Sequence, residues 1–140
     1  MKIEKSYILL LTSIILAFTL MACNITSSRE KSALEPVNKL ISTLYFNKGS
    51  YEDYKNLFTN PQFAFNEDQF NSFRKNPDKT SFKYGNNSTE EIMKHMKAVP
   101  EDANLVTVYY LEDVDKTEIS KALLQWRVEN KDGKWLLKND

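Results

Sequence analysis

Two side chains suited to chemistry occur only once in this chain of 140 residues, the thiol of Cys23 and the imidazole of His95. A thiol can act as a nucleophile or take a covalent modification, and an imidazole can transfer a proton near neutral pH. Catalysis by either group requires a neighbour that sets its pKa. His95 follows Glu91 by four residues in a segment with helical periodicity, which predicts an exposed pair on a helix surface. The residues therefore predict no catalytic site and a protein that is not an enzyme.

A metal site in this chain would have to depend on carboxylates, because cysteine and histidine each occur once. The densest acidic run, EDVD at residues 112–115, lacks the glycine and the alternating ligands of a calcium-binding loop. We expect it to be a solvated turn between strands. Gly49, Gly85 and Gly133 are too widely separated to form a phosphate-binding loop. The sequence predicts no metal and no cofactor.

The first 22 residues have the pattern of an export signal. Lys2 and Lys5 precede an apolar run from Tyr7 to Leu20. This run is shorter than the roughly 20 apolar residues that cross a bilayer as a permanent helix. A charged start followed by a short apolar segment is typical of a signal that is cleaved after export.

The apolar run ends in the tetrapeptide LMAC, residues 20–23, which resembles the lipobox of bacterial lipoproteins. The resemblance implies transfer of a diacylglycerol to the thiol of Cys23 and cleavage just before it. Residues 1–22 are then a lipoprotein signal peptide, and residues 23–33 are a lipidated N-terminus and tether. We expect a protein held at the bacterial cell membrane by fatty acyl chains such as palmitate, facing outside the cytoplasm. The alternative is that Cys23 is one small apolar residue of an uncleaved anchor.

Charge and length limit what the rest of the chain can bind. Residues 23–140 are long enough for one domain and a short tether. The chain has 19 basic and 19 acidic side chains, and residues 1–22 contain two lysines and one glutamate, so residues 23–140 carry 17 and 18. A balance so close to neutral favours neither nucleic acid nor an anionic lipid surface as a partner.

Helices are expected in the first two thirds of the chain. The first begins at Pro36, where a missing N–H costs nothing, and ends before Gly49. Its apolar stripe repeats at steps of three and four residues: Val37, Leu40, Ile41, Leu44 and Tyr45. Ser50 with Asp53, Asn66 with Gln69, and Ser88 with Glu91 are the capping pairs of three more helices. The last of these is expected over residues 88–99, ended by Pro100, and a short strand is expected over residues 80–84.

The C-terminal third is expected to be an antiparallel meander. Residues 103–111 and 121–129 are rich in β-branched and aromatic residues, and Asp132-Gly133 predicts a tight turn into a last strand. Along the middle strand, one face carries only apolar side chains and the other a mixture. The apolar face consists of Ala122, Leu124, Trp126 and Val128.

Two segments resemble the NTF2-like, or cystatin-like, domains of small secreted bacterial lipoproteins. Residues 40–59, LISTLYFNKGSYEDYKNLFT, resemble the opening helices of such domains, and residues 128–140, VENKDGKWLLKND, resemble their closing hairpin. The resemblance implies an α+β fold over residues 34–140, with N-terminal helices packed on a curved antiparallel sheet. A cavity often lies between the two layers. Residues 63–89 depart from the family pattern and leave the number of strands open.

The resemblance does not by itself imply a reaction, because this fold carries enzymes, ligand binders and adaptors. Enzymes of the family use an acidic residue or a His–Asp pair in the cavity, but no spacing supports such a place for Asp53 or His95. We expect a non-catalytic module that binds another envelope or secreted protein. A small-molecule binder or enzyme that uses the cavity is the alternative, and a structural spacer is a third reading. Four aromatic residues either line the cavity or fill the core: Tyr109, Tyr110, Trp126 and Trp135.

Overall fold

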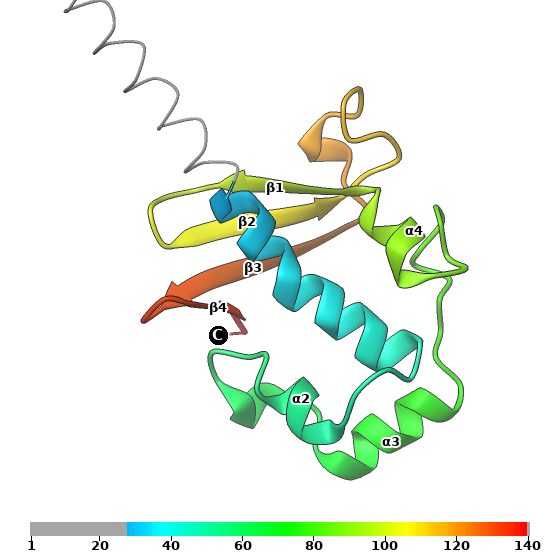
Figure 1. Ribbon diagram of the computed structural model, residues 1–140. Coiled ribbons are helices and arrows are strands. Elements are labelled where there is room, and N and C mark those ends of the chain that lie inside the picture. Colours follow the sequence, from blue (N-terminus) through cyan, green and yellow to red (C-terminus); the bar gives the residue numbers. More distant parts are fainter. Residues whose placement is uncertain (1–27, 140) are drawn as a thin grey trace, which may run out of the picture.

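The computed structural model describes residues 28–139 of the chain. The expected signal peptide, Cys23 and the first part of the expected tether lie outside these residues. The described residues form an α+β fold, in which helices cover one face of a curved antiparallel sheet (Figure 1). The sheet has four strands in the order β1-β2-β3-β4. The expected fold class is confirmed at this level.

A long helix over residues 28–45 lies across the sheet. The expected start at Pro36 is wrong, and residues 28–33 of the expected tether are helical instead. The buried stripe extends one turn further back than expected, to Ala33, which is fully buried with Val37 and Ile41. Pro36 therefore lies inside the helix, where its missing N–H leaves the Ser32 carbonyl without the usual donor. Burial of Ala33 against the core outweighs this loss.

The next helices begin at the predicted capping pairs. In α2 (Tyr51–Lys55), Ser50 and Asp53 form a reciprocal capping box. A 3₁₀ turn, η1 (Pro61–Phe63), leads to α3 (Glu67–Lys75), where Asn66 and Gln69 form a second box. The guanidinium of Arg74 donates to the Asn47 side chain and to the Gly49 carbonyl, at 2.8 and 3.0 Å. This contact ties α3 to the bend after the long helix.

The segment from Asn76 to Ser88 contains no strand, so the strand expected over residues 80–84 is wrong. Phe82 is buried in the core, and the backbone of Tyr84 is held by one side chain. The Tyr110 hydroxyl donates to the Tyr84 carbonyl and accepts from the Tyr84 N–H, both at 2.6 Å. These side-chain contacts take the place of a strand partner.

The helix expected over residues 88–99 is much shorter, because α4 spans only Thr89–Met93. Residues Met96–Pro100 form β1, which pairs antiparallel with β2 (Leu105–Tyr110). Two facts explain the difference. Pro100 disfavours the helical conformation at Val99. As a strand, the five residues Met96–Pro100 also pair with β2, and a helix would not make this pairing.

The rest of the sheet is close to the prediction. A 3₁₀ turn, η2 (Ile119–Lys121), precedes β3 (Leu124–Lys131), and Asp132 and Gly133, both with positive φ, turn the chain into β4 (Lys134–Leu137). Phe58 forms a parallel bridge with Leu137 and closes the outer edge of β4. The core lies between the long helix and the sheet face that carries Val106, Val108 and Val128.

Candidate functional site

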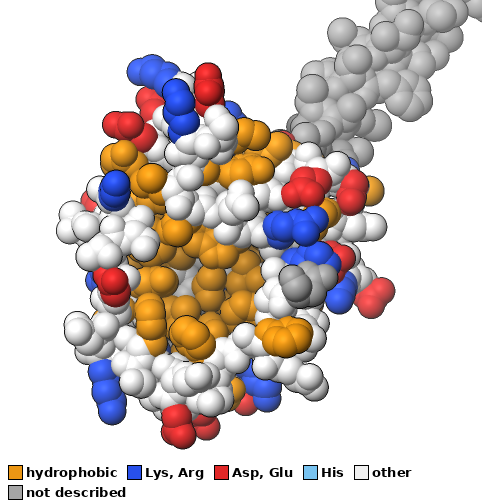
Figure 2. Space-filling model, turned by 180° about the vertical axis from the view of Figure 1, so that it is seen from behind, with side chains coloured by type: hydrophobic (Ala, Val, Ile, Leu, Met, Phe, Trp, Pro, Cys, Tyr) orange, Lys and Arg blue, Asp and Glu red, His pale blue; other side chains and the backbone are white. Residues whose placement is uncertain are grey.

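The face of the molecule opposite to the view of Figure 1 is hollowed and hydrophobic. Figure 2 shows apolar side chains gathered around a depression, with charged side chains at the periphery of this face. We infer that this apolar hollow is lined by five large apolar side chains that are not fully covered: Phe58, Phe65, Phe73, Leu124 and Trp126. Contiguous exposed hydrophobic surface of this kind is typical of binding sites.

The sheet contributes its border through β3. Leu124 and Trp126 lie on the same face of β3 as the fully buried Val128. Leu124 and Trp126 are only half-buried, whereas Val128 is fully buried. Strand alternation thus directs two large apolar side chains into the margin of the core.

The helical side of the hollow is a cluster of aromatic rings. Phe65 lies 5.9 Å from Phe73 and 6.1 Å from Tyr54 between ring centroids, and Phe58 lies 5.1 Å from Tyr54. The backbone of Phe65 is clamped, because its N–H donates to the Tyr54 hydroxyl and its carbonyl accepts from the Tyr51 hydroxyl. Its side chain nevertheless remains 38% exposed. A fixed backbone with an exposed ring presents apolar area at little cost in conformational entropy.

The electrostatics of this region favour apolar binding over acid–base chemistry. None of the five side chains that define the hollow is ionisable. Burial raises the pKa of Tyr54 above its ordinary value, and burial raises that of Tyr45 as well, so both hydroxyls are neutral at physiological pH. The hollow can therefore desolvate an apolar group, but these residues supply no proton acceptor or nucleophile for a reaction.

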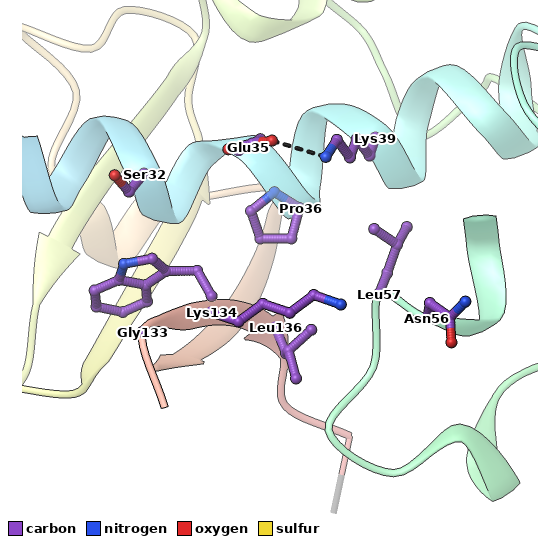
Figure 3. A pocket seen from close by; sticks show the side chains of 10 residues that line it. Ser32, Glu35, Pro36, Lys39, Asn56, Leu57, Gly133, Lys134 and Leu136 are labelled. Atoms are coloured by element: carbon purple, nitrogen blue, oxygen red, sulfur yellow. Dashed lines mark ion pairs between the residues drawn. The ribbon is translucent and has the colours of Figure 1, made fainter. Parts of the chain in front are cut away.

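A second concavity lies between the long helix and the β3–β4 hairpin. Figure 3 shows Pro36 directed toward the hairpin and the side chain of Lys134 extending along the groove toward Leu57. The groove has a volume of about 240 Å³, and Glu35 and Lys39 form an ion pair of 2.7 Å on its helical wall. Exposed pairs of this kind contribute little free energy. We regard the groove as a solvated surface and the apolar hollow as the candidate site.

The residues considered for chemistry from the sequence are not brought together. Cys23 lies outside the described residues. The carboxylate of Asp53 accepts hydrogen bonds from the Ser50 N–H and hydroxyl at 2.8 and 2.7 Å, so its place is the cap of α2. These bonds hold its pKa below the ordinary value.

The expectation that His95 forms an exposed helix-surface pair with Glu91 is wrong. His95 is half-buried in the turn after α4, with its ring stacked on Tyr84 at 5.4 Å. Nδ1 lies 3.1 and 2.9 Å from the carbonyl oxygens of Leu111 and Glu112. Carbonyls only accept, so this nitrogen carries the proton. The ring joins the turn to the end of β2, which is a structural role.

The acidic run 112–115 is a turn, as expected. The carboxylate of Asp113 accepts from the backbone N–H groups of Asp115 and Lys116, at 2.9 and 3.2 Å. These bonds hold its pKa below the ordinary value. Among residues 28–139, no three side chains of His, Cys, Asp or Glu come together in a way that could hold a metal ion.

Of the four aromatic residues of the sheet, Tyr109 is half-buried on the face opposite to Val108 and Tyr110, and the other three divide between the two readings. Tyr110 is fully buried and belongs to the core, whereas Trp126 borders the apolar hollow and Trp135 lines the groove. Sequence reasoning missed Phe58 and Phe65 as site residues. A signal for Phe65 was present in the sequence. It is a large apolar residue directly before the cap Asn66, outside the apolar face of any expected helix, and such a residue is a candidate for an exposed apolar patch.

Comparison with protein-family models, curated proteins and solved structures finds no match for this chain. Within the described residues, no helix has the length and hydropathy required to span a membrane. The candidate site therefore rests on the geometry alone.

Proposed function

We propose that this protein is a lipid-anchored, extracytoplasmic binding module of the bacterial cell envelope. It has no catalytic activity and holds an apolar part of another envelope or secreted protein. The single observation that supports this function is the apolar hollow, an open hydrophobic depression whose defining side chains include no acid, base or nucleophile. Such a surface gains free energy by excluding water from an apolar partner.

The anchor in this proposal is Cys23, supported by the lipobox-like residues 20–23 after a short apolar run. We expect Cys23→Ser to leave a precursor that keeps residues 1–22 and does not incorporate labelled palmitate. Fractionation of cells and mass spectrometry of the N-terminus measure both effects. A Cys23→Ser protein that is processed and membrane-bound like the natural chain would contradict the anchor.

The fold in this proposal is NTF2-like. Support comes from the order of the elements, in which a long helix, a bend at Gly49 and the short helix α2 precede a curved antiparallel sheet. The region of residues 63–89, which departs from the family pattern, runs from the end of η1 to the start of α4 and holds α3 and turns, without a strand. An apolar depression between helices and sheet is also where domains of this kind place a cavity.

The alternative function is a carrier of a small apolar molecule, or an enzyme acting on one. The same hollow supports it, because partly covered Phe and Trp side chains accept either kind of occupant. The two functions differ in the mass of what occupies the hollow in the cell.

A photo-crosslinking amino acid, p-benzoylphenylalanine, placed at Phe65 in the full chain in living cells separates these functions. The matched control carries it at Ile119, which is 43% exposed but lies in the loop before β3. We expect one discrete protein adduct from Phe65, absent from Ile119 and lost with Cys23→Ser. An adduct of less than about 1 kDa would replace the adaptor with the carrier, and equal labelling from both positions would contradict a specific site.

A further inference from the structure

One exposed turn of the molecule is apolar and carries no charge. The segment from Asn56 to Asn66, NLFTNPQFAFN, contains three phenylalanines and no charged side chain, although 27% of the residues of the chain are charged. The turn η1 lies at its centre, and all three residues of η1 are exposed. Among the exposed large hydrophobic side chains of residues 28–139, Phe63 has the largest exposed fraction, 70%. Such surface is typical of a contact with a protein or a membrane.

Hydrogen bonds hold the backbone on both sides of this turn. Before it, Asn60 exchanges two hydrogen bonds with the Asn139 side chain, and its own side chain accepts from the Gln62 N–H at 3.2 Å. After it, the Phe65 N–H donates to the Tyr54 hydroxyl at 3.0 Å. The fold thus presents the turn in one conformation, and a partner does not have to order it on binding.

The two exposed phenylalanines of this segment differ in what they contact. The ring of Phe65 lies 6.1 Å from Tyr54 and 5.9 Å from Phe73 between centroids. Within residues 28–139, Phe63 belongs neither to the core nor to the side chains packed against it. The fold does not use the ring of Phe63, which is therefore available to contact another molecule.

The proposed anchor keeps one end of the domain close to a bilayer. The long helix begins at residue 28, five residues after Cys23. Whatever their conformation, five residues span at most about 18 Å. The first turns of the helix are attached to the fold, because Arg29 donates to the Asp102 carbonyl at 3.4 Å and Ala33 is fully buried. A lipidated Cys23 therefore holds this end of the domain within about 18 Å of the bilayer surface.

A row of paired residues leads from this end of the domain to the exposed turn. Asp102 follows Pro100, the last residue of β1, by two positions. From Pro100, pairing continues across the sheet to the segment before η1, through Val106, Val128, Leu137 and Phe58. Neighbouring strands lie about 4.8 Å apart, so these four steps cover about 19 Å. One bilayer can contact both the anchored end and the turn when this row lies parallel to its surface.

The chemistry of the turn suits the interfacial region of a bilayer. Charged side chains are costly in an apolar environment, and the eleven residues Asn56–Asn66 include none. One phenylalanine offers little apolar area, but a covalent anchor raises the local concentration of the turn at the membrane surface. The chain has equal numbers of acidic and basic side chains, which fits a contact that depends on apolar area and not on anionic lipid.

We propose that η1 is a second membrane contact, in which Phe63 enters the interfacial region of the bilayer that holds the lipidated Cys23. The two contacts together orient the domain on the membrane. This inference rests on the lipid anchor of the proposed function and adds the part of the domain that faces the bilayer.

Fluorescence quenching by labelled lipids tests the proposal. Cys23 is the only cysteine of the chain, and lipidation blocks its thiol, so a cysteine introduced elsewhere can be labelled with the fluorophore NBD. The lipidated full chain with Gln62→Cys is labelled and reconstituted into phosphatidylcholine nanodiscs whose acyl chains carry nitroxide groups. We expect at least about twofold lower fluorescence than in nanodiscs without nitroxide. The matched control is Asn86→Cys, an exposed position before α4, which should not be quenched.

A second pair of variants identifies the side chain responsible. In the labelled Gln62→Cys chain, Phe63→Ser should reduce quenching to the level of the Asn86→Cys control. Ile119→Ser, which also removes an exposed apolar side chain, should leave quenching unchanged. Both side chains lie outside the core, so both variants should fold. Absent quenching at position 62, equal quenching at positions 62 and 86, or quenching that survives Phe63→Ser would each overturn the membrane contact.

The outcomes separate this inference from the proposed function. Mass spectrometry of the N-terminal peptide of the same sample shows whether Cys23 carries lipid. A lipidated chain without quenching at position 62 refutes the contact of η1 and leaves the anchor in place. An unmodified Cys23 refutes the anchor and, with it, the contact. A blue shift of NBD emission in native membranes without quenching in nanodiscs would assign the turn to a protein partner and overturn this inference.

Discussion

A single buried hydroxyl organises a segment that has no regular structure. Tyr110 is fully buried on β2, and its hydroxyl satisfies both the N–H and the carbonyl of Tyr84. Burial raises the pKa of Tyr110, which keeps the hydroxyl protonated and able to donate. The same ring packs edge-on against Phe82 at 5.5 Å. One residue thus couples residues 76–88 to the sheet.

We predict that Tyr110→Phe lowers the free energy of unfolding by about 2 kcal/mol, because two backbone groups of Tyr84 lose their partner in a buried site. Urea unfolding measures the change. The matched control is Tyr109→Phe on the same strand, a half-buried tyrosine on the opposite face of the sheet, which should cost less than about 0.5 kcal/mol. Equal effects of the two substitutions would show that the hydroxyl of Tyr110 has no special role.

Also at the residue scale, the hydrogen-bonded carboxylate of Asp53 should make the free energy of unfolding depend on pH. Its folded pKa lies below the ordinary value, chiefly because the Ser50 N–H and hydroxyl donate to the carboxylate. A lowered folded pKa adds stability above the unfolded pKa of about 3.9, and this stability disappears as the pH falls through the folded pKa. The unfolding free energies of the natural chain and of Asp53→Asn should therefore converge between about pH 5 and pH 2. A difference that stays constant over this range would contradict the capping role of the charge.

At the scale of elements, the turns that enter α4 and β4 use glycine for different reasons. Gly85 has a φ of +66°, and a Cβ there would lie 2.7 Å from the backbone carbonyl group of Glu91 in α4. Gly133 has a φ of +83°, but a Cβ there would meet nothing within 4 Å. The first turn thus requires both the left-handed conformation and close approach to a helix, and the second requires only the conformation.

We predict that Gly85→Ala destabilises the protein by at least about 2 kcal/mol, whereas Gly133→Ala costs about 1 kcal/mol. The excess comes from the collision with Glu91, which is backbone and cannot rotate away. Urea midpoints of the two variants, compared under the same conditions, measure the difference. A larger cost for Gly133→Ala would contradict the close packing of this turn on α4.

At the scale of the whole molecule, the last described residues of the chain close one end of the core. Leu137 pairs with Leu57 and Thr59, at N···O distances of 2.7 and 2.8 Å, across the end of the core. Asn139 extends this closure to Asn60.

We predict that Asn139→Ala lowers the free energy of unfolding by about 1–2 kcal/mol, because its amide joins Thr59 and Asn60 through three partly buried hydrogen bonds. The control is Asn86→Ala, an exposed asparagine in the segment before α4, which should be close to neutral. Both variants are compared by urea unfolding. If Asn139→Ala is as neutral as Asn86→Ala, the C-terminal closure does not contribute to stability.

Most of the elements could be predicted from local patterns. The capping pairs at Ser50 and Asn66 were correct because a cap is formed by residues three apart, and its geometry is present in the sequence itself. The turn at Asp132 and Gly133 and the faces of β3 were correct for the same reason. By contrast, residues 96–100 suit a helix locally and became β1 because β2 lies beside them. Residues 80–84 suit a strand and have no neighbouring strand to pair with.

The sequence by itself determined the helices that carry their own caps and the C-terminal meander, since each depends on residues close together in the chain. Only the tertiary structure decided the start of the long helix, the strand β1 and the apolar hollow. These features depend on contacts between distant residues, such as Phe65 on Tyr54 and Leu137 on Leu57. The sequence does not distinguish a half-covered side chain such as Trp126 from a fully covered one. Its exposure is set by where the packing of other elements ends.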